Sequence, residues 1–316
     1  MISDKIIAVV IPCYNEESQI AGVISSIPAY VDHIFVVDDK STDGSVALIE
    51  QISQSGEGVE LLKHEVNQGN GAARISGLKK CLDIGADVVC LLDGDGQMDI
   101  NALGALIDPV LNGKFDIIKG NRFFSGEAWK QMPKVRYFGN AILSLMTKIV
   151  SGYWQIADFQ SGYIVVNRRT LELLPLDHLY KDYGFPNDLL IHANVFGLRV
   201  GDYPVKPIYN VGEKSGIRYV TLIPKLGCLL ITRFFWRMKE KYIIRDFHPL
   251  VFFYLFGIGL LLSGIPLMVR FFYKWYINHD VPPITALALI FVLISGFQFI
   301  FFAMWFDMTY SKNKSE

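Results

Sequence analysis

The sequence predicts an α/β domain built on a mainly parallel sheet, followed by a two-helix hairpin that crosses a membrane. Over residues 1–210, short apolar runs alternate with helical patterns, and two long segments further along carry no charged residue. The composition agrees with this division, because 51% of the 316 residues are hydrophobic and only 19% are charged. A chain this apolar is not intrinsically disordered, and its apolar excess is concentrated in the two long segments.

Five short apolar runs predict strands, and four patterns of helical period predict the helices between them. The strands are expected at Ile6–Ile11, His33–Asp38, Glu60–His64, Asp87–Leu92 and Asp116–Lys119. The helices are expected at Ser18–Ile27, Ser45–Gln54, Gly71–Ile84 and Ile100–Leu111. Strands that alternate with helices form βαβ units around a parallel sheet, whose ligands bind beyond the carboxyl ends of the strands. The residues that follow each strand are therefore the candidate site.

Polar clusters follow the first four predicted strands, at Pro12–Glu17, Asp38–Gly44, Asn67–Gly71 and Asp93–Gln97. Taken alone each has a plainer explanation, since Asp38–Gly44 equally suits a polar turn that ends in a helix cap. The third cluster imitates a dinucleotide-binding glycine motif, but Arg74 stands where the third glycine belongs, so a nicotinamide cofactor is not expected. Four clusters at consecutive strand ends favour one binding site over four unrelated turns.

The fourth cluster contains the hard oxygen ligands of a divalent cation. An EF-hand that began at Asp93 would need a glycine where Met98 lies and a glutamate where Gly104 lies, so that motif is not satisfied. What remains is Asp93 and Asp95, two residues apart at a strand end, with the side-chain amide of Gln97 nearby. Oxygen ligands at this spacing suit Mg²⁺ or Mn²⁺ bridging a diphosphate.

Charge and cysteine usage exclude other classes of protein. The 30 Lys and Arg residues nearly balance the 31 Asp and Glu residues, so no broad basic field exists and nucleic acid is not an expected partner. The four cysteines lie far apart and the six histidines form no clustered ligand set, which argues against a disulfide framework and a zinc site. Cysteines spaced in this way are typical of a reducing compartment.

The segments 249–269 and 284–306 contain no charged residue. At 1.5 Å per residue each extends roughly 30 Å, the thickness of a hydrocarbon core, which favours membrane-spanning helices over buried core helices. The cations before the first segment are Lys225, Arg233, Arg237, Lys239, Lys241 and Arg245, whereas the turn between the segments carries only Arg270 and Lys274. The positive-inside rule predicts a two-span protein in a lipid bilayer, with its N-terminal domain and its tail in the cytoplasm.

These features divide the chain into six predicted parts. The α/β domain takes residues 1–218, and amphipathic juxtamembrane helices take residues 219–247. Such helices lie in the membrane interface or pack on the domain, and the sequence leaves both open. The spans are residues 248–270 and 284–306, joined by an extracytoplasmic turn at 271–283 and followed by a tail at 307–316. The apolar run near residue 6 is too short for the core of a signal peptide.

Six motifs, in order, make the chain resemble the family 2 glycosyltransferases of GT-A fold. They are Val9–Glu17, Val37–Ser45, Asn67–Arg74, Asp93–Gln97, Gly120–Phe123 and Asp158–Tyr163. The resemblance covers about residues 6–220 and is greatest to the dolichol-phosphate mannose synthases and the bacterial polyprenyl-phosphate sugar transferases. It implies an enzyme that moves one sugar from a UDP- or GDP-sugar to a polyprenyl phosphate. Such enzymes invert the anomeric carbon by direct displacement, without a covalent enzyme intermediate.

The resemblance implies donor-binding roles for residues at the first four strand ends. The nucleotide-sugar-binding residues are Pro12, Tyr14, Glu16, Asp39, Asn67, Gly71 and Asp93. Among them Asp39 would accept a hydrogen bond from the base. Asp93, Asp95 and Gln97 would hold Mg²⁺ or Mn²⁺, which stabilises the negative charge of the leaving nucleoside diphosphate.

The implied acceptor needs cations more than a general base, because a polyprenyl phosphate is largely a dianion at neutral pH. Arg122 and Arg136 match family positions that clamp this phosphate. Asp188 lies near the position of a base in many relatives, and it could serve as the base, orient the acceptor or cap a helix. Relatives often carry R-x-x-G-x-S-K before the membrane segment, where this chain has Tyr209–Ser215 without the arginine. The remaining acceptor-phosphate candidates are Lys214, Ser215 and Arg218.

Two other readings of the sequence stay open at this stage. The chain could add a sugar to a polysaccharide or glycolipid, although the Q-x-x-R-W motif of processive synthases is absent from its sequence. It could also be a silent membrane scaffold, against which the intact Asp93, Asp95 and Gln97 argue. The sequence identifies neither the sugar nor the lipid length, and it leaves a homo-oligomer open.

Overall fold

The computed structural model describes residues 5–55, 58–124, 126, 129, 134–208, 219–279 and 281–313. The chain divides into two compact units, Met1–Phe234 and Phe235–Glu316. The first unit is an α/β domain, and the second consists mainly of two long helices. The predicted fold class is confirmed.

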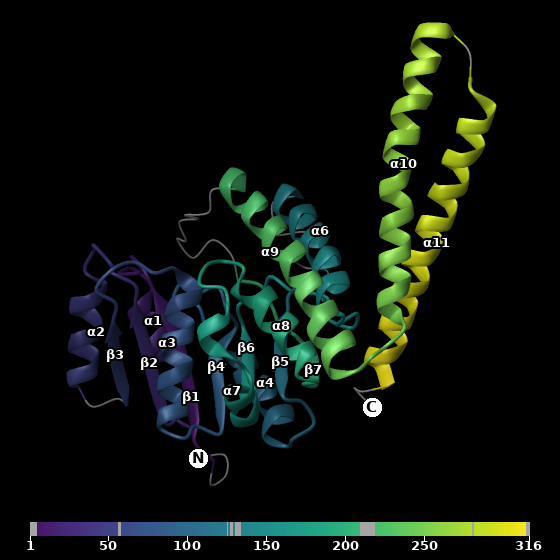
Figure 1. The fold of residues 1–316 in the computed structure, drawn as a ribbon. Coiled ribbons are helices and arrows are strands. Elements are labelled where there is room, and N and C mark those ends of the chain that lie inside the picture. The colour runs from purple at the N-terminus through teal and green to yellow at the C-terminus, as the bar shows by residue number, and fades with distance from the viewer. Residues whose placement is uncertain are drawn as a thin grey trace. The chain divides into compact units, whose positions relative to one another are not determined.

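Seven strands form one sheet in the order β3-β2-β1-β4-β6-β5-β7, which runs across the domain in Figure 1. They are β1 (Ile7–Cys13), β2 (His33–Asp38), β3 (Val59–Lys63), β4 (Val88–Leu91), β5 (Ile117–Asn121), β6 (Ile164–Asn167) and β7 (Val200–Pro204). β6 pairs antiparallel with β4 and β5, whereas the other strand pairs are parallel. The five predicted strands are found within two residues of their expected ends, and β6 and β7 are additional.

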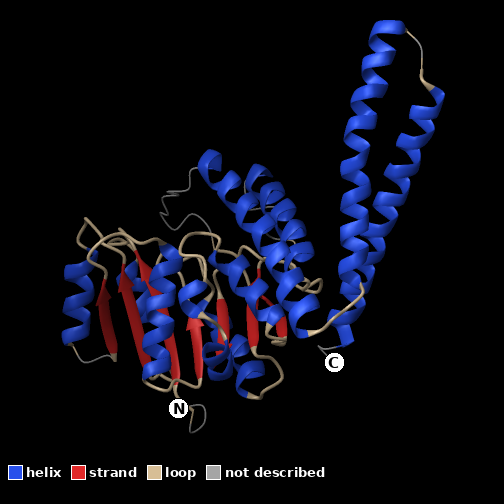
Figure 2. Ribbon diagram, in the orientation of Figure 1, coloured by secondary structure: helices blue, strands red, loops and turns tan. Residues whose placement is uncertain are grey.

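Helices cover both faces of this sheet (Figure 2). One face carries α1 (Ile20–Ser26), α2 (Ser45–Gln54) and α4 (Leu103–Leu111), and the other carries α3 (Asn70–Asp83), α7 (Arg168–Leu173) and α8 (Phe185–Val195). Side chains of a strand alternate between its two faces. Accordingly Ile7, Val9 and Ile11 pack in the core on the face with α1, α2 and α4. Ala8 and Val10 pack in the core on the face with α3, α7 and α8. β1 is apolar throughout because both of its faces are buried.

Short 3₁₀ helices, η1 (Ile100–Ala102) and η2 (Leu176–His178), complete the loops of the sheet. The strand register brings the carboxyl ends of the central strands level with one another, since Cys13 pairs with Asp38 and Val10 with Leu91. Asp39 continues this alignment by donating its backbone N–H to the carbonyl of Cys13 at 2.9 Å. The polar clusters that follow these strands therefore meet at one edge of the sheet.

Two further helices of the first unit pack near α8. α6 (Lys134–Ser151) contacts α8 directly. α9 (Tyr219–Lys239) buries Leu226, Leu229 and Leu230. A Cβ placed on Gly184 would lie 2.6 Å from Leu229, so α9 closely approaches the start of α8. The first half of the predicted juxtamembrane segment is thus one helix that packs on the domain, and the compact unit extends to Phe234.

The second unit begins in the last turn of α9 and continues through η3 (Glu240–Arg245), α10 (Leu250–Asn278) and α11 (Pro283–Asn313). α10 and α11 pack along each other, and both are long and apolar enough to cross a membrane. Buried Arg237 pairs with buried Asp307 at 2.8 Å and so ties the end of α9 to α11. The predicted turn at 271–283 is corrected, because residues 271–278 are helical. These residues are mostly aromatic and include no glycine or proline, so the helix continues up to His279, which takes the left-handed conformation.

Candidate active site

A cavity of about 1200 Å³ opens at the carboxyl edge of the sheet. Its lining comes mainly from the ends of the strands and the segments that follow them. These residues are 12–19, Asp39, Thr42, Asp43, Asn67, Gly69, Asn70, Ala73, Arg74, 93–95, 97–99 and Arg122. Residues 160–163, Asp182, Tyr183, Pro186 and residues 205–208 complete it. The position beyond the parallel strand ends is the one that the sequence predicts.

Acidic side chains gather in this cavity. Glu16, Asp93 and Asp95 all line it, and the Asp93 side chain keeps 30% exposure. Burial raises the pKa of the Glu16 carboxyl to about 7, and the nearby charges of Asp95, Asp93 and Asp43 add to the rise. Negative charge gathered in this way favours a bound cation.

The predicted cation ligands lie together, and their chemistry fits a metal that is shared with a substrate. Asp93, Asp95 and Gln97 all line the cavity, and Asp95 accepts a hydrogen bond from the backbone N–H of Gln97 at 3.0 Å. Among the described residues, no three His, Cys, Asp or Glu side chains converge as a complete cage. Mg²⁺ commonly takes one or two carboxylates and fills its other positions with water and substrate phosphates. Two carboxylates and one amide meet that requirement.

Arg74 is a buried part of this site that the sequence analysis did not assign. It extends from α3 with 2% of its side chain exposed and forms an ion pair with Asp93. Its other donors reach Asn70 at 2.8 Å and the carbonyl of Gly162 at 2.9 Å. A Cβ on Gly162 would lie 2.7 Å from Asp93, so a side chain there would collide with this arrangement. Arg74 therefore fixes the orientation of a predicted metal ligand.

The predicted nucleoside-binding residues divide into two groups. Pro12, Tyr14 and Glu16 line the cavity, with Tyr14 half exposed. Asp39 also lines it, but its carboxylate already accepts the backbone N–H groups of Gln68 and Gly69, each at 2.8 Å. A ring nitrogen of His64 lies 2.7 Å from the same carboxylate. In this structure Asp39 shapes the loop before α3, and its bond to a base stays a prediction.

The remaining two residues that are predicted to bind the nucleotide sugar, Asn67 and Gly71, have mainly structural contacts. Asn67 lines the cavity and donates its side-chain amide to the carbonyl of Asp39 at 3.0 Å. Gly71 is not among the described lining residues, and a Cβ there would lie 2.5 Å from the carbonyl oxygen of Tyr180. Ala72 donates its N–H to the carbonyl of Lys181 at 2.9 Å beside it. Gly71 thus permits the close approach of α3 to residues 180–181.

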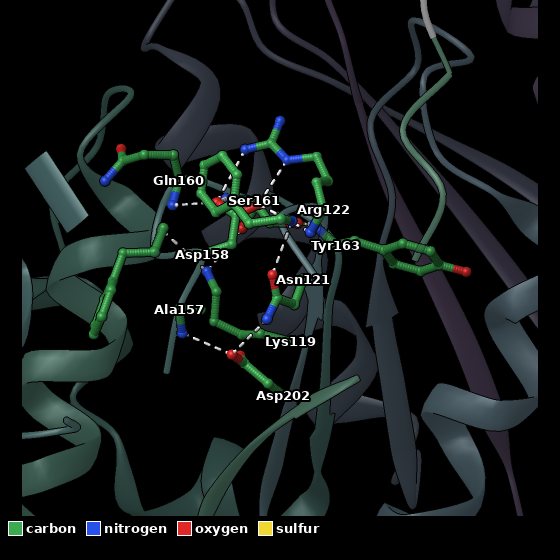
Figure 3. Close-up of polar contacts among 11 residues, drawn as sticks. Lys119, Asn121, Arg122, Ala157, Asp158, Gln160, Ser161, Tyr163 and Asp202 are labelled. Carbon is green, nitrogen blue, oxygen red and sulfur yellow. Dashed lines mark hydrogen bonds and ion pairs between the residues drawn. The ribbon is translucent and has the colours of Figure 1, made fainter. Parts of the chain in front are cut away.

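Arg122 also lines the cavity, and a buried carboxylate holds its side chain (Figure 3). Its Nε and Nη2 donate to the two oxygens of Asp158 at 2.7 and 3.1 Å. Burial raises the pKa of the Asp158 carboxyl, but the charge and hydrogen bonds of Arg122 outweigh burial and hold it below its usual value. The pair fixes the guanidinium plane before any ligand binds.

A second buried charge supports the same loop. Lys119 is fully buried and donates to the carbonyls of Phe159 at 3.1 Å and Ser161 at 2.8 Å (Figure 3). Burial lowers the pKa of Lys119 to about 7, although Asp158 and Asp202 oppose the shift. Burial likewise raises the pKa of Asp202 to about 6, and its carboxylate accepts the N–H of Ala157 at 2.7 Å. These contacts hold residues 157–161 in place, and Asp158 of this segment in turn binds Arg122.

Asp188 is placed away from the cavity lining. Its carboxylate is fully buried, accepts the backbone N–H of Tyr180 at 2.8 Å and pairs with Arg233 of α9 at 2.6 Å. The helix-cap alternative is wrong, because Gly184 is the N-cap of α8, no side chain caps that end, and the Asp188 carboxylate accepts the N–H of Tyr180 instead. Asp188 links α8 to α9 in this structure, and a role as base or in orienting the acceptor stays a prediction.

The other acceptor candidates are placed only in part. Arg136 belongs to α6, but its side chain lies outside the described part of the chain. Lys214, Ser215 and Arg218 all fall in 209–218, outside the described residues. Lys206 lines the cavity from the end of β7, and the sequence analysis did not single it out. A single sequence gives no signal for it, because an isolated lysine after an unrecognised strand resembles any surface lysine.

Comparison with known proteins defines the class of enzyme. The model of the family described as Glycosyl transferase family 2 matches residues 8–174. The chain belongs to this family and is a glycosyltransferase. A curated relative from Methanococcus voltae, a UDP-N-acetylglucosamine–dolichyl-phosphate N-acetylglucosaminyltransferase, is 32% identical over 250 residues, which cover 72% of this chain and 99% of the relative.

A second curated relative is the polyprenol monophosphomannose synthase of Mycolicibacterium smegmatis. It is 29% identical over 201 residues, which cover 62% of this chain and 75% of the relative. Among solved structures, glucosyl-3-phosphoglycerate synthase from Mycobacterium tuberculosis matches with a TM-score of 0.53 and 20% identity, over 74% of this chain and 80% of that one. This likeness shows the GT-A fold of the domain.

Proposed function

We propose that this glycosyltransferase moves one sugar from a nucleotide-diphosphate sugar to a polyprenyl phosphate, with Mg²⁺ or Mn²⁺ as cofactor. The observation that carries the proposal is a single cavity that is lined both by acidic Asp93 and Asp95 and by the cation Arg122. The same chain carries two helices long and apolar enough to cross a membrane. The names of both curated relatives, which refer to dolichyl phosphate and to polyprenol, support the acceptor.

The acidic side would bind the diphosphate of the donor through the cation. Asp93, Asp95 and Gln97 would hold that ion, which supplies positive charge to the leaving nucleoside diphosphate. Arg74 keeps Asp93 oriented, so the ligand set is preorganised rather than assembled on binding. Pro12 and Tyr14 border the space in which the nucleoside would lie.

The reaction requires no proton transfer to start. An oxygen of the acceptor phosphate forms the bond to the anomeric carbon as the bond from that carbon to the donor diphosphate breaks, and the electron pair leaves with the nucleoside diphosphate. Because the phosphate is already ionised at neutral pH, the protein needs to position it and offset its charge. Apart from Arg74, the cations that line the cavity among the described residues are Arg122 and Lys206. They would position the acceptor phosphate and offset its charge.

The orientation in the membrane belongs to the same proposal. Six cations between Lys225 and Arg245 precede α10, compared with Arg270 and Lys274 near its far end. This asymmetry supports a cytoplasmic catalytic domain by the positive-inside rule. Nucleotide sugars and the phosphate group of the acceptor would then meet on the cytoplasmic side.

The test is a product analysis with the full chain. Purified protein in detergent is incubated with polyprenyl phosphate, Mg²⁺ or Mn²⁺ and a panel of UDP- and GDP-sugars, and the lipids are analysed by mass spectrometry. We expect the lipid to gain the mass of one sugar only when metal is present. Asp95→Ala should abolish that product, whereas Asp108→Ala, on the exposed side of α4, should retain it.

Two results would overturn parts of this proposal. A lipid product that forms equally well with a chelator would remove the metal requirement. Metal-dependent binding of a nucleotide sugar without any lipid product would leave the donor site standing and remove the polyprenyl-phosphate acceptor. A polysaccharide or glycolipid acceptor would then be the reading to test.

A further inference from the structure

The outward face of α6 is apolar, although it belongs to the α/β domain and not to the hairpin. Phe138, Ile142, Leu145 and Met146 are 55%, 61%, 56% and 44% exposed. Their spacing places them on one side of the helix. Ser144, Thr147 and Val150 are buried on the other side, where the helix faces the domain. α6 thus turns an apolar stripe away from its own domain.

Aromatic residues extend this stripe at its N-terminal end. The rings of Trp129 and Phe138 meet edge to face with centroids 5.9 Å apart, and Tyr137 lies 5.2 Å from Trp129. Lys134 places its ammonium group 3.5 Å from the centre of the Trp129 ring. Phe124 is 74% exposed nearby in sequence. Exposed Trp and Tyr rings next to cations are typical of protein surfaces at the boundary between lipid headgroups and acyl chains.

The aromatic residues continue directly from the cavity. Phe123 packs against Tyr137 with ring centroids 5.4 Å apart, and it follows Arg122, which lines the cavity. The apolar surface therefore begins where the proposed acceptor phosphate would bind. A phosphate carried on a long hydrocarbon chain needs such a neighbouring surface, because its chain cannot cross open water without cost.

The helix that ends the α/β domain packs on the same helix as α6. α9 and α6 both pack on α8, the first through Leu229 against Gly184 and the second by direct contact. α9 exposes Ile223 and Ile231, and the chain continues from it towards the membrane-length helix α10. Apolar patches of this extent on a protein with membrane-length helices favour lipid over water as their neighbour.

We propose that the α6 surface (Phe124, Trp129, Phe138, Ile142, Leu145 and Met146) inserts into the interfacial layer of the lipid bilayer beside the cavity mouth. This inference rests on the proposed function for the lipid nature of the acceptor. Insertion would place Arg122 at the depth of the lipid headgroups, where a polyprenyl phosphate carries its charge. Cations at the edge of the surface, such as Lys134, would meet anionic headgroups.

The direct test measures lipid contact and needs no activity. Full-length protein carrying Cys228→Ser and Ile142→Cys is labelled with an environment-sensitive fluorophore and reconstituted into liposomes that contain doxyl-labelled lipids. The three other cysteines are buried and should not react. We expect blue-shifted emission and strong quenching at position 142. The matched control, Ser25→Cys on the exposed side of α1, should show neither.

Two outcomes would overturn the proposal. Equal quenching at positions 142 and 25 would show that the α6 surface does not enter the bilayer. Disulfide-linked dimers through Ile142→Cys without quenching would show that a second copy of the chain covers this surface. If quenching is strong but no lipid product forms with any donor, the surface stands and the proposed acceptor fails, so the two proposals can fail separately.

A kinetic arm tests the consequence for catalysis. Ile142→Glu with Leu145→Glu should raise the KM for long-chain polyprenyl phosphate in liposomes by at least about tenfold and change kcat little. The KM for the donor, and activity on a short-chain prenyl phosphate in solution, should stay as in the parent protein. Equal losses on the long and short acceptors would indicate damage to the domain and contradict the membrane role.

Discussion

The charged residues of the cavity region form two groups with different electrostatics, named here for their proposed roles: the donor side (Glu16, Asp93 and Asp95) and the acceptor side (Arg122 and the buried charges around the loop 157–161). On the donor side, the segments after β1 and β4 direct Glu16, Asp93 and Asp95 into the cavity, where burial and mutual repulsion raise the pKa of Glu16 to about 7. On the acceptor side, the charges around the loop 157–161 are paired or hydrogen-bonded before any ligand arrives. Arg122 pairs with Asp158 there, and Lys119 is satisfied by two carbonyls.

This difference predicts which substitutions should affect ligand binding and which should affect the stability of the domain. The donor side brings three carboxylates together against Arg74, so a bound cation would change its electrostatics. The acceptor side has already balanced its charges within the protein, so its geometry is preorganised. Substitutions of the donor-side carboxylates should mainly affect ligand affinity and turnover. Substitutions of the buried charges on the acceptor side should mainly affect the stability of the domain.

The largest expected effect comes from breaking the Arg122–Asp158 pair. Asp158→Asn leaves Arg122, whose side chain is only 18% exposed, without its countercharge. We expect the variant to lose about 3–5 kcal/mol of unfolding free energy, as is typical when one partner of a buried ion pair is removed. Chemical denaturation of the detergent-solubilised protein, followed by near-ultraviolet circular dichroism, measures the loss.

The matched control breaks a surface pair in the same domain. Arg168 and Glu172 pair at 2.8 Å with side chains 50% and 52% exposed. Because exposed pairs are screened by solvent, Glu172→Gln should cost less than about 1 kcal/mol. Similar losses in the two variants would contradict the view that the acceptor side is held by buried charge.

The same contrast explains what could be predicted from the sequence. Asp93 and Asp95 could be placed because they follow a strand of a parallel sheet, where topology brings polar residues to one edge. Arg74, Lys119 and Asp202 could not, because a buried charge and a surface charge look alike in a single sequence. Lys119 meets partners 40 and 42 residues away, and only the fold brings them together.

The strands divide in a similar way. β1 and β2 are apolar runs buried on both faces, and their sequence pattern predicts them well. β7 reads Val-Gly-Asp-Tyr-Pro, in which Gly, Asp and Pro are residues that strands disfavour, so its pairing with β5 had no local signal. β6 has only four residues and lies antiparallel between β4 and β5. Tertiary pairing, and not propensity, selects both.

The contribution of Lys119 to the unfolding free energy should depend on pH. In the unfolded chain the pKa of lysine is about 10.5, whereas burial lowers the pKa of Lys119 to about 7 in the folded protein. The unfolded state therefore binds more protons in this window, and the contribution of Lys119 to stability rises with pH across it. Between pH 7 and about pH 9 we expect a rise of about 2 kcal/mol. Lys119→Met should lack this rise.

The measurement compares the unfolding free energies of the parent protein and Lys119→Met at several pH values. Asp202 acts in the opposite direction and in a lower window, because burial raises the pKa of its carboxyl from 3.8 to about 6. The folded state binds more protons there, so that contribution falls as pH rises towards 6. A constant difference between the two proteins from pH 7 upwards would refute a buried lysine that titrates near neutrality.

The smallest expected effect sharpens the role of Gly71 on the donor side. A Cβ at this position would lie 2.5 Å from the carbonyl oxygen of Tyr180 and 2.7 Å from the carbonyl carbon of Lys181, both backbone atoms that cannot move freely. Gly71→Ala should therefore destabilise the domain by about 1–2 kcal/mol through overpacking. Gly22→Ala in α1, where nothing lies within 4 Å, should instead stabilise it by up to about 1 kcal/mol. If Gly71→Ala preserves stability but raises the KM for the nucleotide sugar, Gly71 contacts the donor as the family resemblance implies, and close packing is not its main role.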